Sequence, residues 1–333
     1  MVFAWFKTMI SLSPEHKLTK TALFTQWASL VAYGGGGLSL LCFPKVWSAI
    51  LAFEISQTDE GFMRMSGIYL LAVGFCYIIV ARNGSCVGKQ GPMLSSIFER
   101  LFLVNAALLM SFLRGMVPLY FATLFMTLDT TLSVLTLYIW FKETSHASAR
   151  TLVKEVFGSL KNSWSLNQRA LSALVVQIIG FLQFSGGAVL MIFPTLIAKP
   201  LKLQLDEGQN YSFQSCWFLL ISILGWFHIF SGGADLTSFA IAAVFYRASF
   251  AVPLQCIMYF CDQLELNFLL FVGSFECTFT VVIILFILLD KTKQATRIQV
   301  LRLTPEPLEN GRAIDIVTKS TTAQDSVKDQ GAL

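Results

Sequence analysis

Apolar residues gather in long runs along this chain, and each run is bounded by charged residues or by Gly and Pro. The runs cover residues 22–43, 64–81, 94–113, 118–141, 171–193, 214–231, 238–260 and 265–289. An α-helix needs about 20 residues to cross roughly 30 Å of hydrocarbon, whereas a membrane β-barrel shows short segments of alternating polarity. The pattern therefore predicts an all-α membrane protein with eight transmembrane helices and the lipid bilayer as a partner.

One glycine-rich pattern occurs twice in these runs. The segment "YGGGGLSLLCFP" at 33–44 is matched by "SGGAVLMIFP" at 185–194. The pairs that coincide at one constant offset are Gly36 with Gly186, Gly37 with Gly187, Leu40 with Leu190, Phe43 with Phe193 and Pro44 with Pro194. Because each half holds an even number of spans, both halves enter the bilayer from the same side, which predicts two parallel four-helix repeats.

This repeat sets the expected organisation of the chain. The predicted segments are 1–21, a cytosolic or interfacial N-terminus; 22–141, the first four-helix repeat; 142–170, a basic cytosolic linker; 171–289, the second four-helix repeat; and 290–333, a cytosolic disordered tail. The tail is polar and lacks aromatic residues, a composition that cannot bury a core. A cytosolic protein is the partner class that such a tail suits, and no nucleic-acid partner is expected.

Composition and charge favour a membrane location as well. Of the 333 residues, 55% are hydrophobic and 13% are charged, and the mean hydropathy is +0.65. So few charges cannot coat a soluble globule of this size. Lys and Arg concentrate before the first span, after the second, in the linker and after the last span. The positive-inside rule therefore places both termini in the cytosol, without choosing between plasma membrane and endoplasmic reticulum.

Four ionisable residues lie inside the predicted spans at matching positions: Arg100 and Asp129 in the first half, Arg247 and Glu276 in the second. The members of each pair are 29 residues apart and are centred on a hairpin turn, so they lie at equal depth on antiparallel helices. A lone charge in mid-span costs roughly 2.5 to 3.5 kcal/mol, and pairing removes most of that cost. Each arginine is therefore predicted to face its carboxylate, either lining a polar cavity or ion path or clasping two helices together.

The matched glycines Gly36, Gly37, Gly186 and Gly187 also need a reason, because an interior glycine costs a water-exposed helix roughly 0.8 to 1 kcal/mol relative to alanine. Glycines at matching positions of two halves point to a transporter-like site, where backbone approaches a substrate. Close packing of two membrane helices is the alternative, and it is the explanation that we prefer. Since glycines and charges lie at one level, we expect a site only if both face the same cavity.

Other motifs carry less information. His228 occupies the place that Tyr77 holds in the first half, which indicates a polar tip at the membrane interface. Three scattered histidines and seven cysteines without a CxxC pair predict neither a metal site nor a disulfide framework. Since no phosphate loop, nucleophile elbow or HExxH occurs, we expect no cofactor and no enzymatic activity.

A short motif in the first half suggests a family. The order Gly36-Gly37, Phe43-Pro44 and Arg64-Met65-Ser66-Gly67 resembles the animal four-span tumour-suppressor-inducible protein eleven family and, more loosely, the DoxX-type four-helix membrane proteins. The second half keeps the glycines and the Phe-Pro pair but has Ser215 and Phe218 in place of the Arg and Gly. The resemblance implies an intracellular-membrane protein without established catalysis.

Two classes of function fit these observations. The first is a transporter or channel that moves an ion or small polar solute along a path near the paired charges. The second is a non-catalytic membrane scaffold or regulatory protein whose charge pairs are structural clasps.

Glycosylation tests the predicted orientation. Asn83 and Asn210 both begin an Asn-x-Ser pattern, and only Asn210 is expected on the lumenal or external side. In a eukaryotic host we expect one N-glycan, seen as a gel shift that a glycosidase removes. The shift should disappear in Asn210→Gln and persist in Asn83→Gln, and the reverse dependence would overturn the orientation.

Overall fold

The computed structural model describes residues 18–87, 89–161, 169–201 and 213–303, and every regular element among them is a helix. The elements, with η marking a π-helical segment, are α2 (Lys20–Ala28), η1 (Ser29–Gly35), α3 (Gly36–Cys42), α4 (Pro44–Ile50), α5 (Gln57–Val87), α6 (Gly91–Phe98), η2 (Glu99–Val104), α7 (Asn105–Leu113), α8 (Leu119–Glu143), α9 (Ala149–Lys161), α10 (Leu171–Ile192), α11 (Thr195–Leu201), α12 (Gln214–Gly233), α13 (Thr237–Tyr246), η5 (Arg247–Ala251), α14 (Val252–Phe260) and α15 (Leu266–Leu303). The predicted all-α class is confirmed for these residues. Asn210, the first 17 residues and the tail beyond Leu303 lie outside the described residues.

Seven described helices are long and apolar enough to cross a membrane, which supports an integral multi-pass protein. They are Gln57–Arg82, Gly91–Leu113, Leu119–Glu143, Leu171–Ile192, Gln214–Gly233, Thr237–Phe260 and Leu266–Lys293. The predicted span 22–43 is not among them, although α2, η1 and α3 follow one another without a break over 9, 7 and 7 residues. Its four glycines, Thr25 and Gln26 lower the mean hydropathy of this segment.

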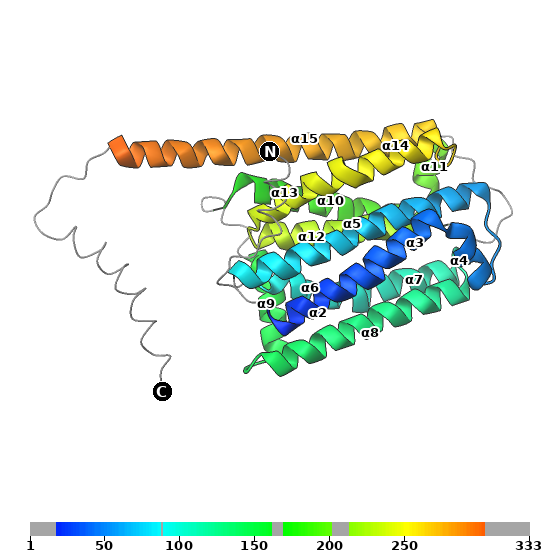
Figure 1. The fold of residues 1–333 in the computed structure, drawn as a ribbon, viewed down its shortest axis with the longest axis horizontal. Coiled ribbons are helices and arrows are strands. Elements are labelled where there is room, and N and C mark those ends of the chain that lie inside the picture. Colours follow the sequence, from blue (N-terminus) through cyan, green and yellow to red (C-terminus); the bar gives the residue numbers. More distant parts are fainter. Residues whose placement is uncertain (1–17, 88, 162–168, 202–212, 304–333) are drawn as a thin grey trace, which may run out of the picture. The chain divides into compact units, whose positions relative to one another are not determined.

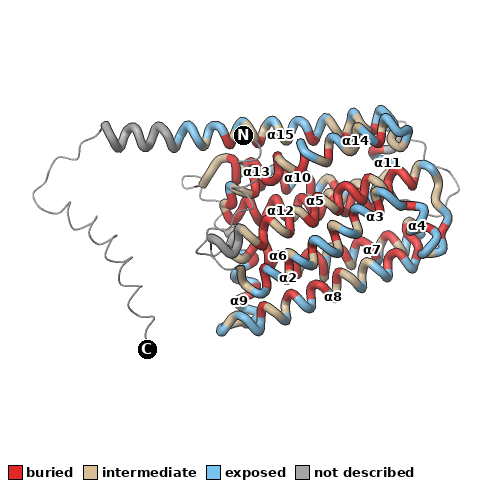
Figure 2. The backbone as a smooth tube through the Cα atoms, viewed as in Figure 1, coloured by how far each residue is buried: buried red, intermediate tan, exposed pale blue. Residues whose placement is uncertain are grey.

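Helices α5 and α12 lie at the centre of the part of the chain that ends at Leu288, and the other helices surround them (Figure 1). In their apolar stretches 78% of the α5 residues and 89% of the α12 residues are buried, against 22% for α8. Figure 2 shows the same gradient from a buried centre to exposed outer faces. The outer helices expose apolar side chains such as Val31, Leu113 and Phe260, which suits contact with lipid.

The motif behind the family resemblance closes the end of α3. Phe43 leaves helical geometry and Pro44 begins α4, so α3 ends there with carbonyl groups that lack helical partners. The Nη1 atom of Arg64 donates a hydrogen bond to the carbonyl oxygen of Leu41 at 2.5 Å. The order of residues in the motif therefore has a local physical cause: Pro44 ends α3, and the Arg64 side chain from α5 binds a carbonyl group at that end.

The last glycine of the motif brings α3 and α5 into backbone contact. A Cβ atom added to Gly37 would lie 2.8 Å from the Gly67 carbonyl oxygen, and one added to Gly67 would lie 2.6 Å from the Gly37 carbonyl oxygen. Real Cβ atoms do not approach so closely. Small residues permit this spacing between membrane helices, so Gly37 serves helix packing.

The predicted linker and tail contain more helix than the sequence indicated. The linker 142–170 includes α9, whose Leu152 and Val156 are buried, and the Phe157 ring centre lies 5.8 Å from that of Phe98. Helix α15 continues to Leu303, past the predicted start of the tail at 290.

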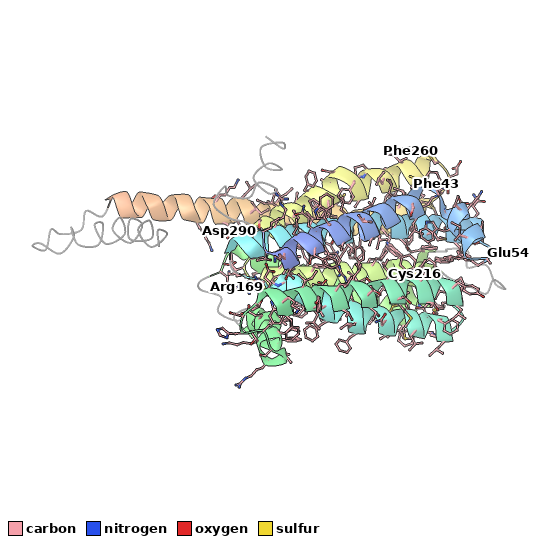
Figure 3. The ribbon with its side chains drawn as sticks, turned by 60° about the horizontal axis from the view of Figure 1, so that its bottom comes forward. Phe43, Glu54, Arg169, Cys216, Phe260 and Asp290 are labelled. Atoms are coloured by element: carbon pink, nitrogen blue, oxygen red, sulfur yellow. The ribbon has the colours of Figure 1, made fainter. Side chains whose placement is uncertain are left out.

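The two ends of the bundle carry different residues. Phe43, Glu54 and Phe260 lie at one end and Arg169 lies at the other (Figure 3). Near the first end, Arg114 donates from Nη1 to the carbonyl oxygen of Ile192 at 2.6 Å, which links the first hairpin to the end of α10.

Replacing Gly37 by alanine should destabilise the fold, because the new methyl group would meet backbone: the Gly67 carbonyl oxygen at 2.8 Å and the Leu71 nitrogen at 2.9 Å. We expect a loss of about 1 to 3 kcal/mol, seen as a lower unfolding midpoint of the purified protein in a bilayer mimetic. Gly35→Ala is the matched control, since a Cβ on Gly35 has no atom within 4 Å. Equal midpoints for the two variants would contradict the close α3–α5 contact.

Candidate functional site

Arg247 and Glu276 form a direct salt bridge in the interior of the bundle. Arg247 begins η5, Glu276 lies on α15, and the distance from Arg247 Nε to Glu276 Oε2 is 2.6 Å. Their side chains are 0% and 5% exposed. Hairpin geometry predicted this meeting, and the structure brings the two residues together. A guanidinium buried so deeply needs such a partner, because an unpaired charge in low dielectric is strongly destabilising.

Three further side chains complete what we call the second-half cluster. Tyr69 on α5 donates its hydroxyl hydrogen to Glu276 Oε1 at 2.7 Å. Arg247 Nη2 lies 3.5 Å from Gln183 Oε1 and 3.3 Å from His228 Nε2. Because α5 belongs to the first half of the chain, the second-half pair depends on a helix of the other half.

The predicted interfacial position of His228 is wrong, because its side chain is fully buried. Its Nδ1 atom lies 2.5 Å from the carbonyl oxygen of Leu224, which can only accept, so Nδ1 carries the proton. Nε2 is then free to accept a hydrogen bond from Arg247. Tyr77 is fully buried too. Each of these two residues lies beside an arginine: His228 beside Arg247 and Tyr77 beside Arg100.

The first-half cluster joins Arg100 and Asp129 less directly. Arg100 Nε is 3.9 Å from Asp129 Oδ1 and donates to the Tyr77 hydroxyl at 2.9 Å. Tyr77 in turn donates to Glu99 at 2.5 Å, and Tyr33 donates to Asp129. The guanidinium carbon lies 4.2 Å from the centre of the Tyr77 ring, a cation–π contact. The predicted pair therefore meets within a network of tyrosines.

Glu99 is the ionisable residue that the sequence analysis missed. Its side chain is 1% exposed, and its place next to Arg100 in the chain was the available signal. In the second half, the residue that directly precedes Arg247 is Tyr246. The two clusters therefore differ in charge: the first has two carboxyl groups for one guanidinium, and the second has one of each.

Both arginines lie in π-helical segments. Arg100 is the second residue of η2 and Arg247 is the first residue of η5. A π-helical turn interrupts the regular hydrogen-bond spacing of an α-helix and often occurs at functional sites. The same irregularity at two matched arginines is what a repeated unit would produce.

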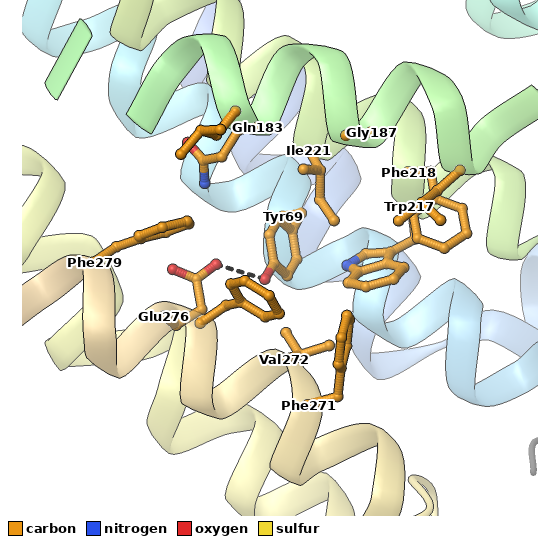
Figure 4. A pocket seen from close by; sticks show the side chains of 14 residues that line it. Tyr69, Gln183, Gly187, Trp217, Phe218, Ile221, Phe271, Val272, Glu276 and Phe279 are labelled. Atoms are coloured by element: carbon orange, nitrogen blue, oxygen red, sulfur yellow. Dashed lines mark hydrogen bonds between the residues drawn. The ribbon is translucent and has the colours of Figure 1, made fainter. Parts of the chain in front are cut away.

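A pocket of about 310 Å³ lies beside the second-half cluster, between α5, α10, α12 and α15 (Figure 4). Gly186, Gly187 and Glu276 all line it, so matched glycines and a predicted charge face one cavity in this half. Gln183 and Trp217 line it as well, and the Nε1 atom of Trp217 has no hydrogen-bond partner among the described residues. Most of the remaining lining is aliphatic or aromatic.

The four predicted glycines have different surroundings. Gly187 packs against α12, where a Cβ would lie 2.7 Å from the Phe218 carbonyl oxygen, much as Gly37 packs against α5. A Cβ on Gly186 would meet no atom within 4 Å, so this glycine leaves space at the pocket wall. A Cβ on Gly36 would make an ordinary contact of 3.6 Å with a side chain of α5.

A smaller pocket of about 60 Å³ lies beside the first-half cluster. Tyr33, Asp129 and Ser66 contribute its polar side chains, and neither Gly36 nor Gly37 lines it. The first half therefore does not reproduce the shared cavity of glycines and charge.

No family model matches the chain, and no curated protein or solved structure shows significant similarity to it. In the described part of the chain no group of three or more His, Cys, Asp or Glu side chains is arranged to hold a metal ion.

Breaking the second-half pair should cost more than removing it. Arg247→Gln alone would leave the Glu276 carboxylate buried without its cation, for a loss of about 3 to 5 kcal/mol in the free energy of unfolding. The double variant Arg247→Gln with Glu276→Gln removes both charges and should lose much less. Unfolding midpoints of the purified variants in lipid report both values. A double variant that loses the sum of the two single losses would contradict a direct pair.

Proposed function

We propose that this chain is a multi-pass membrane carrier whose substrate occupies the pocket beside the second-half cluster. The observation that carries the proposal is the shared lining of one cavity by Gly186, Gly187 and Glu276. Backbone exposed by glycine, next to a buried polar group, is the usual composition of a transporter site near the bilayer midplane. Glu276 and Gln183 would then contact the substrate, while Arg247 keeps its salt bridge with Glu276.

The proposed topology has eight spans in two parallel four-helix repeats, with both termini in the cytosol. The eighth span is the continuous helix from α2 through α3, whose exposed side chains include Leu23, Trp27 and Val31. Apolar side chains on an outer surface are suited to lipid. Support for the repeat comes from the matched arginines in η2 and η5 and from the matched glycine contacts of Gly37 and Gly187.

The pocket favours an amphipathic substrate over a simple ion. Leu182 is 58% exposed and Phe275 is 49% exposed, and both line the pocket, so it opens toward the outer face of the bundle, where lipid would lie. Glu276 is already neutralised by Arg247, and the donor left free is Trp217 Nε1. A small molecule with an apolar body and a neutral hydroxyl or carbonyl group matches this lining, since burying a second net charge would be costly.

A scaffold or regulatory role is the second candidate, and the first half favours it. Gly37 is used for packing and Gly36 lines neither pocket, while Arg100 and Asp129 are held by tyrosines. These features are the ones expected of a structural contact that clasps helices together. The resemblance to the four-span family and a protein partner for the tail are part of this second proposal.

Occupancy of the pocket can be tested with a simple amphiphile. n-Decanol combines an apolar chain with a neutral hydroxyl group, and it should raise the unfolding midpoint of the purified full-length protein in lipid nanodiscs, because binding to the folded state stabilises it. Gly186→Leu places a side chain in the pocket from a position where a Cβ meets no atom within 4 Å, and it should abolish the increase. Gly35→Leu, which is equally open but lines neither pocket, should retain it.

The charge of the head group supplies the second comparison. Decylamine and decanoate have the same chain and should raise the midpoint less than decanol. An increase that is equal in Gly186→Leu and in the unmodified protein would show binding elsewhere and would overturn the carrier site.

A further inference from the structure

The first-half cluster buries more acid than base. Glu99 is 1% exposed, Arg100 0% and Asp129 5%. With both carboxyl groups ionised, this cluster would hold one uncompensated negative charge inside a transmembrane bundle, where isolated charges are strongly disfavoured. We propose that Glu99 and Asp129 share one proton, so that this cluster is a proton-binding site; the inference does not depend on the substrate pocket of the second half.

The second-half cluster provides an internal comparison. Tyr246 stands where the first half has Glu99. His228 donates from Nδ1 to Leu224, and its Nε2 faces a nitrogen of Arg247 that can only donate, so Nε2 carries no hydrogen and the ring is neutral. Arg247 and Glu276 therefore balance each other without a proton. The extra carboxyl group in the first half, that of Glu99, is the reason that only the first-half cluster needs a proton to reach the same balance of charge.

The groups that face the shared proton come from four elements. Tyr77 on α5 donates to Glu99 and accepts from Arg100, and Tyr33 on η1 donates to Asp129 on α8. The side chain that α12 packs against Tyr77 is Phe227, which is apolar. Since one guanidinium is the only cation in this set, it can balance one carboxylate and leaves the other to be neutralised by a proton.

A small pocket adjoins Asp129. The 60 Å³ pocket is lined by Asp129, Tyr33 and Ser66, and the Ser66 hydroxyl is buried without a hydrogen-bond partner among the described residues. Both terminal nitrogens of Arg100 are also buried without a hydrogen-bond partner among the described residues. Most of the lining is apolar, but the volume leaves room for water, and the side chains of Tyr33, Asp129 and Ser66 offer the polar partners that a water molecule needs. Water there would connect Asp129 to its surroundings and exchange its proton.

A proton fits the cluster better than a metal cation does. Monovalent and divalent metal ions in proteins are surrounded by several oxygen ligands. Here Arg100 already occupies the neighbourhood of both carboxyl groups, and a second fixed cation beside it would be repelled. The shared proton adds no such repulsion, because it leaves a neutral carboxylic acid next to an ion pair.

Infrared spectroscopy of the full-length protein in lipid tests the proposal at neutral pH. The spectrum should contain the carbonyl band of a neutral carboxylic acid that shifts in D₂O. Glu99→Gln and Asp129→Asn should each remove this band entirely, because the one carboxyl group that remains is balanced by Arg100 and ionises. Glu265→Gln, at an exposed position, is the control and should leave the band unchanged.

Three outcomes would overturn the shared proton. They are absence of the band in the unmodified protein, persistence of the full band in both variants, and a band that disappears on addition of sodium at constant pH. The first and third need no variant, so they remain decisive if Glu99→Gln or Asp129→Asn does not fold. A pocket that fails to bind decanol would leave all of these results unaffected.

Discussion

A guanidinium group that is buried among transmembrane helices must find a carboxylate and hydrogen-bond acceptors inside the protein, and this constraint organises the structure. Arg100 and Arg247 are both fully buried, and each lies within reach of a carboxylate on the neighbouring helix of its hairpin. Removing a charge from water costs free energy, and an ion pair offsets this cost only with good geometry and further hydrogen bonds. The tyrosines around both arginines supply part of that geometry.

The same constraint joins the two halves of the chain. Tyr69 lies on a helix of the first half but donates to Glu276 in the second. Its helix, α5, forms the buried centre of the bundle together with α12. The hydrogen bond of Tyr69 thus ties the second-half cluster to a central helix of the first half.

Much of this arrangement could be predicted from the sequence, because it follows from periodicity and spacing. The length of the apolar runs predicts an all-α membrane protein. The equal distances of Arg247 and Glu276 from their hairpin turn predict the pair, which the structure shows at 2.6 Å. The roles of Tyr69 and His228 could not be predicted in this way. They depend on how helices distant in sequence pack side by side, and that information is absent from the spacing within one hairpin.

The glycines show the limit of sequence matching most clearly. Gly186 and Gly187 are adjacent and both have matched partners, yet Gly187 packs against α12 and Gly186 borders a cavity. One residue of helix is a rotation of about 100°, so neighbours with the same chemistry face different surroundings. The first predicted span is a related case, since the glycines that permit packing also reduce the hydropathy by which a span is recognised.

The buried pairing of Arg247 with Glu276 is the central claim, and solid-state NMR of the full-length protein in lipid bilayers tests it most directly. With ¹⁵N-labelled arginine and ¹³C-labelled glutamate, the account predicts a strong dipolar contact between the Arg247 guanidinium and the Glu276 carboxylate, with little magnetisation transfer from bulk water. A guanidinium that shows no carboxylate contact, or that exchanges freely with bulk water, would contradict it.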